Sequence, residues 1–136
     1  MRAGGIGAWF PEALRNRGNP FVLQQFRAGG FEPTVRLDTE IWCICLAGTS
    51  TCWPRRALIG GLPGHVDVKV FRLCESSRDL LAGSASAKEA EERDQAIFLA
   101  NHAREAMQAA LGELSARPSA ASQRGHGEQA KLRRRG

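Results

Sequence analysis

Residues 97–114 read IFLANHAREAMQAALGEL, and apolar side chains recur in this stretch every three or four positions. That spacing places them along one side of an α-helix. Just upstream, Ser86-Ala87-Lys88-Glu89 has the sequence of a capping box, in which a serine and a glutamate satisfy free amides at a helix start. The sequence therefore predicts one long amphipathic helix over residues 85–116.

Upstream of this helix, three segments carry strand-like patterns. Residues 66–73 alternate valines at 66, 68 and 70 with polar residues, which predicts a half-buried strand. Residues 34–38 (TVRLD) alternate in the same way and predict a second one. Residues 41–46 (IWCICL) are apolar at every position, so their period fits either a strand buried on both faces or a short buried helix.

The N-terminal third is punctuated by glycine and proline. Ala8-Trp9-Phe10 predicts a short strand that Pro11 stops. Asn19-Pro20 predicts a helix start, because asparagine caps helices and proline suits the first helical position. That helix is expected to end at Gly29-Gly30, residues 47–50 to form a turn, and residues 55–59 to form a turn of helix. The alternation of strands and helices indicates an α/β protein.

The chain has 136 residues, which suits one domain, and a formal net charge of +5. Six of its 19 cations and one of its 14 acids lie after Leu114, so the first 114 residues carry 13 of each and are neutral. Residues 117–136 are rich in Ser, Ala, Gly and Arg, which predicts a basic, disordered tail. Such a tail either stays solvated or contacts nucleic acid without sequence specificity.

Several classes of protein are disfavoured. The longest apolar run, Ile41–Ala47, has seven residues, and a membrane span needs about 20. Residues 1–18 lack the apolar block of a secretory signal, so we expect a cytoplasmic protein with no membrane partner.

No catalytic or metal-binding motif stands out. The four cysteines, Cys43, Cys45, Cys52 and Cys74, lack the paired spacing of structural zinc sites. The three histidines are scattered along the chain. We therefore expect no enzyme activity, no cofactor and no metal, with metal or redox chemistry at the cysteines as a less favoured alternative.

Several segments, in this order, resemble the effector-binding domain of LysR-type transcriptional regulators. They are residues 8–11 (AWFP), 19–21 (NPF), 26–35 (FRAGGFEPTV), 46–48 (LAG) and 53–58 (WPRRAL). The resemblance implies a partial periplasmic-binding-protein-like subdomain over residues 1–84, with a short mixed sheet and flanking helices. The helix over 85–116 and the tail over 117–136 would follow it.

The resemblance also implies a function and a site. The chain would be a truncated effector-binding domain that senses a small, carboxylate-bearing molecule in transcriptional regulation. The effector would lie against Asn19, Pro20 and Phe21 at the expected helix start and against Gly48 and Thr49 in the following turn. Expected partners are the effector and either a homo-oligomer or a full-length regulator, without sequence-specific DNA binding by this chain alone.

A second hypothesis comes from the residues themselves. The long amphipathic helix could pair with a partner while the basic tail contacts nucleic acid non-specifically, which would make the chain a small interaction module.

Overall fold

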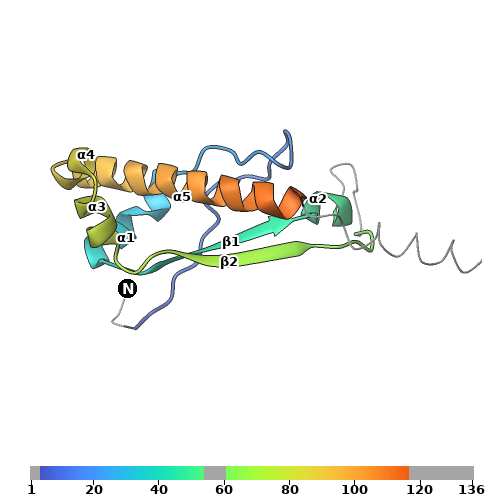
Figure 1. The fold of residues 1–136 in the computed structure, drawn as a ribbon, viewed down its shortest axis with the longest axis horizontal. Helices are drawn as coiled ribbons and strands as arrows, with labels where there is room; N and C mark the ends of the chain where they lie inside the picture. The colour runs from blue at the N-terminus through green and yellow to red at the C-terminus, as the bar shows by residue number, and fades with distance from the viewer. Residues whose placement is uncertain (1–3, 54–60, 117–136) are drawn as a thin grey trace, which may run out of the picture.

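A computed structural model of the chain describes residues 4–53 and 61–116 (Figure 1). Its elements in chain order are the 3₁₀ turn η1 (Ala28–Gly30), α1 (Glu32–Leu37), β1 (Ile41–Ala47), α2 (Thr49–Cys52), β2 (Asp67–Cys74), α3 (Ser77–Ala82), α4 (Ala85–Lys88) and α5 (Glu92–Ala116). The prediction of an α/β chain with a long C-terminal helix is confirmed. The expected turn of helix over 55–59 and the tail over 117–136 lie outside the described residues.

The sheet is an antiparallel pair of β1 and β2, in which Ile44 lies opposite Val70 and Leu46 opposite Val68. Within the described residues no parallel strand joins it, so the sheet is not the mixed one we expected. The strand predicted over 66–73 is confirmed one residue further along. The ambiguous segment 41–46 is a strand, and alternate residues of β1 are buried and exposed along its whole length.

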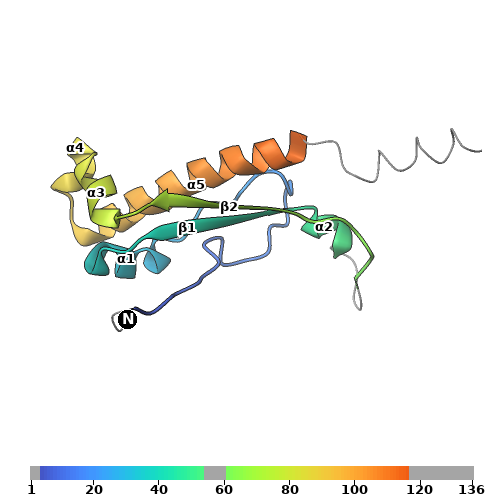
Figure 2. The same cartoon turned by 60° about the horizontal axis from the view of Figure 1, so that its bottom comes forward.

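Helix α5 forms a second layer along one face of this hairpin, and Figures 1 and 2 both show it running beside the two strands. Its apolar side supplies nearly half of the buried apolar residues: Ala96, Leu99, Ala100, Ala103, Ala110, Leu111 and Leu114. The hairpin contributes residues from its inner face, among them Ile41, Cys43 and Cys45. The helices α1, α3 and α4 gather at one end of the layers and α2 at the other (Figure 1).

The predicted helix over 85–116 is interrupted at residues 89–91, which separate α4 from α5. Ser86 does not cap a helix here, because it lies inside α4, whose N-cap position is Ser84. The break lets Ala87 turn into the core, where it is 3% exposed. Gln95 closes the junction by donating a hydrogen bond of 3.2 Å to the Ala87 carbonyl.

Three N-terminal predictions are wrong. Residues 8–10 form no strand, and Trp9 instead packs edge-on against Phe31, with 5.3 Å between ring centroids. Residues 19–27 form no helix, and only the last three residues of the predicted helix, Ala28–Gly30, form a 3₁₀ turn, η1. Residues 34–37 of the predicted strand over 34–38 lie in α1, where Pro33 occupies the first turn, and the Thr34 hydroxyl donates a 2.6 Å bond back to the Phe31 carbonyl.

None of the helices in residues 4–53 and 61–116 has both the length and the apolar character that a membrane span requires.

Candidate functional site

The side of the hairpin that faces away from α5 carries an apolar surface. We call it the outer face and define it by five side chains, each about half exposed: Trp42 (57%), Ile44 (60%), Leu46 (48%), Val68 (55%) and Val70 (56%). The register makes it contiguous, because Ile44 lies opposite Val70 and Leu46 opposite Val68, while Trp42 lies opposite Arg72.

This composition is unusual for a sheet face in contact with water. A two-layer antiparallel sheet normally alternates apolar residues toward the core with polar residues toward solvent. Strand β1 places only apolar residues on both sides, and β2 places a single polar residue, Arg72, among its central outward positions. Five half-exposed side chains of this size present roughly 500 Å², near the upper end of what a monomer exposes as one patch. Such a patch indicates a binding surface.

Charged residues close one end of the outer face. The Arg72 guanidinium lies 3.2 Å from a carboxylate oxygen of Glu40 and 2.5 Å from one of Glu75. It also lies 5.9 Å from the ring of Trp42. The cation is thus held by two acids beside an aromatic ring, which gives the apolar surface a polar rim of the kind that protein interfaces have.

The predicted effector residues near the N-terminus lie in a loop against α5, where they form no helix start. The Phe21 amide donates to the Asn19 side-chain oxygen at 2.9 Å, so Asn19 closes a local turn. The Phe21 carbonyl accepts a 2.9 Å bond from the Gln108 side chain of α5. Both backbone groups of Phe21 therefore have partners within the protein, and a ligand for them would have to replace these bonds.

Side chains of α5 hold the rest of this loop in an extended form. Gln108 accepts a 2.8 Å bond from the Leu23 amide. Arg104 donates to the carbonyls of Leu23, at 3.0 Å, and Gln24, at 2.9 Å. The Leu23 side chain packs against both parts of the core. These hydrogen bonds hold residues 21–24 against α5, and we call this segment the strap.

We expect Gln108→Ala to release the strap. The substitution leaves the Leu23 amide and the Phe21 carbonyl without their partners, which costs about 1–2 kcal/mol of unfolding free energy. The rate of amide hydrogen exchange should rise at Leu23, while the amides of α5 stay protected from exchange. Glu105→Ala, an exposed position on the same helix, is the control. Unchanged exchange at Leu23 in Gln108→Ala would contradict the assignment of these bonds.

The other two predicted effector residues lie at the end of the hairpin. Gly48 follows β1 with a φ of +92°, and Thr49 begins α2. A methyl group at Gly48 would come within 2.3 Å of the His65 carbonyl oxygen, so the glycine is required where the two chain segments touch. Its position has a structural reason, and its role in effector binding stays a prediction.

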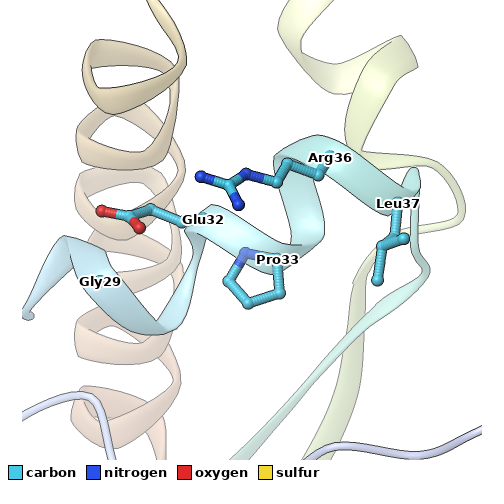
Figure 3. A pocket seen from close by; sticks show the side chains of 5 residues that line it. All are labelled: Gly29, Glu32, Pro33, Arg36 and Leu37. Atoms are coloured by element: carbon cyan, nitrogen blue, oxygen red, sulfur yellow. The ribbon is translucent and has the colours of Figure 1, made fainter. Parts of the chain in front are cut away.

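Two hollows on the surface of the described residues are lined by none of the predicted effector residues. One of about 510 Å³ is lined by Leu14, Arg15, Arg17 and Gln24. The other, of about 300 Å³, lies at η1 and α1 and is lined by Gly29, Glu32, Pro33, Arg36 and Leu37 (Figure 3). The Arg36 side chain extends across it and pairs with Glu92 of α5. Both hollows are shallow and open, which does not suit the deep enclosure that small ligands prefer.

The cysteines of the hairpin face the core. Burial raises the pKa of the Cys43 thiol from 9.0 to about 11, and the neighbouring thiols of Cys45 and Cys74 add to the shift. A thiol in this state is protonated at neutral pH and poorly nucleophilic. In the described part of the chain, no three His, Cys, Asp or Glu side chains are grouped so that they could hold a metal ion.

The raised pKa of Cys43 makes stability fall at alkaline pH. An unfolded thiol loses its proton near pH 9.0, whereas folded Cys43 keeps it to about 11. The folded state then binds more protons, so the free energy of unfolding drops as pH rises through this window. We expect urea titrations of Cys43→Ala to show a smaller drop between these pH values than the unaltered chain. Equal drops would contradict the shift.

We did not predict the outer face from the sequence, although the sequence contains a pattern that indicates it. Residues 41–46 are apolar on both sides of a strand, which is typical of a strand covered on both faces. The second hypothesis, in contrast, assigned the amphipathic side of residues 97–114 to a partner. It is occupied by the chain's own hairpin, with Leu99 and Leu111 buried.

Comparison of the chain with models of known protein families, with curated proteins and with solved structures found no match.

Proposed function

We propose that this chain is a protein-interaction module that binds a protein partner through the outer face of its β1–β2 hairpin. The proposal rests on one observation: five large apolar side chains lie together on that face and each is about half exposed. Their burial is the main free energy that the surface offers, at about 25 cal/mol per Å² before the costs of association.

The chemistry of the face favours protein over nucleic acid. Single-stranded nucleic acids are bound by rows of aromatic side chains within a basic groove. Here Trp42 is the aromatic residue, the other four side chains are aliphatic, and Arg72 is paired with two acids, Glu40 and Glu75. Aliphatic side chains around a tryptophan, with a polar rim, match the composition of protein interfaces.

The hairpin is also suited to binding because it is rigid. Its inner face is fixed to α5 by buried contacts, and Lys69 of β2 lies 2.5 Å from a carboxylate oxygen of Glu113 on α5. The outer side chains are therefore held on a backed sheet before any partner arrives. Such preorganisation lowers the entropy that binding costs.

The LysR-type resemblance, with a periplasmic-binding-protein-like subdomain and an effector site, remains a separate hypothesis. Its expected site depended on a helix start at Asn19, and in the structure this residue closes a turn within the loop. The outer face offers more direct support for a function than these residues do.

The proposal can be tested with a photo-reactive amino acid in the full chain, expressed in its own cells. We would place benzoylphenylalanine at position 70, on the outer face, and at position 109, an exposed position of α5, as the control. We expect a protein adduct from position 70 and none from 109. No adduct from position 70, equal adducts from both positions, or an adduct with RNA would each overturn the proposal.

A further inference from the structure

We infer that the partner of the outer face is a second copy of this chain, packed hairpin against hairpin about a two-fold axis that runs across the strands. This inference rests on the proposed function, because it assigns the occupant of the same surface. The two sheets would lie about 10 Å apart, the usual spacing of packed sheets. Each dimer would then contain four layers, in the order helix, sheet, sheet, helix.

The shape of the outer face suits this arrangement. Its central row is Ile44 with Val70, and the rows on either side differ in size: Trp42 with Arg72 at one end, and Leu46 with Val68 at the other. A two-fold axis across the strands, through the central row, places the large Trp42 of one copy against the smaller Leu46 of the second copy. Large side chains facing small ones allow the two surfaces to interdigitate.

The charges at the rim also favour antiparallel packing of the two hairpins. The end near Trp42 carries Arg72 between Glu40 and Glu75, which leaves a net charge of one negative. Two copies with their strands parallel would bring these two acidic ends together. The antiparallel two-fold arrangement separates them by the length of the hairpin, so repulsion disfavours the first orientation and not the second.

The area of the face is sufficient for a weak dimer. Two patches of roughly 500 Å² would bury about 1,000 Å² from apolar side chains, which is at the lower limit for a specific interface. Contacts of Arg72 and the rim would add to this. We therefore expect an interface that forms in the micromolar range of concentration.

The composition of β1 is a further reason for a sheet-on-sheet contact. Residues Ile41–Ala47 are apolar on both sides, as in strands that lie between two layers. In one copy, α5 supplies the layer on the inner side. A second hairpin supplies the missing layer with the same kind of aliphatic surface.

Sedimentation velocity on the purified full chain tests this inference. Between about 1 and 300 µM, we expect the average mass to rise from 14.8 kDa toward twice that value. Ile44→Lys should weaken association at least tenfold, because it places two like charges at the centre of the contact. Ile97→Lys, the same change at an exposed position of α5, should leave association unchanged. Circular dichroism would check that each variant folds.

A charge exchange tests the two-fold axis itself. Ile44→Lys and Ile44→Glu should each be monomeric alone, and their mixture should recover a dimer, because this symmetry sets position 44 opposite itself. A mixture that stays monomeric, or a dimer that Ile44→Lys does not weaken, would overturn the inference.

The crosslinking result separates the two proposals. If the purified chain is monomeric up to 300 µM and position 70 crosslinks to a different protein, the second copy is wrong and the docking surface stands. If position 70 gives no adduct in cells, both are wrong.

Discussion

Leu99→Ala is expected to lower the free energy of unfolding by about 2–5 kcal/mol, the range for leucine-to-alanine changes in protein cores. Leu99 has no exposed surface and lies in the part of the core that joins α5 to Phe31 and Ile41. Truncation removes its apolar contacts and leaves a cavity that a small two-layer fold fills only in part. Urea denaturation followed by circular dichroism measures the loss.

A matched control lies on the same helix. Ile97 is 41% exposed, so Ile97→Ala should cost less than about 1 kcal/mol. If both substitutions had the same small effect, the packing of α5 against the hairpin would be contradicted, and with it the existence of a distinct outer face.

Gly48→Ala is expected to destabilise the chain by about 2 kcal/mol or more. The backbone at Gly48 has a φ of +92°, which side chains other than glycine rarely adopt, and this alone costs about 1 kcal/mol or more. The added methyl would also meet the His65 carbonyl oxygen at 2.3 Å, so the link between β1 and the segment before β2 must shift. Thermal unfolding should show a clear drop in midpoint.

The same substitution elsewhere should have the opposite sign. Gly112 lies inside α5, and no atom would lie within 4 Å of a methyl placed on it. Alanine favours the helix by about 0.8–1 kcal/mol over glycine, so Gly112→Ala should stabilise the chain. If Gly48→Ala were neutral, the tight contact at the end of the hairpin would be wrong.

The parts of the fold that the sequence predicted well are those governed by local pattern. The alternation over 66–73 became β2 and the apolar spacing over 97–114 became the body of α5, because each pattern continues over several turns or several pairs of residues. A long pattern of one period has few other ways to bury its apolar side.

The wrong predictions concern residues whose structure is decided by distant partners. Asn19-Pro20 has the local signature of a helix start, yet the following residues are extended because Gln108 and Arg104, more than 80 positions away, bind their backbone. Residues 34–38 alternate like a strand, yet residues 34–37 lie in α1, where Thr34 is buried and its hydroxyl donates to the Phe31 carbonyl. Such contacts leave no periodic signal.

The candidate site was unpredictable for a related reason. Residues 41–46 are apolar on both faces of a strand, which indicates that each face packs against another layer. The sequence does not determine which of the two faces packs against α5. Once α5 packs on the side of Cys43 and Cys45, the side of Trp42 and Ile44 is left to water. Only the pairing of helix and hairpin shows which face of the hairpin stays exposed.

The most direct measurement of the central claim is hydroxyl-radical footprinting of Trp42. Trp42 and Trp53 are exposed to similar extents, 57% and 50%, so Trp53 serves as an internal reference. We expect the ratio of Trp42 to Trp53 oxidation to be several-fold lower in cells than in the dilute purified chain, because a partner covers the outer face. The same ratio in both conditions would show that the outer face stays open to water, and would contradict its role as a docking surface.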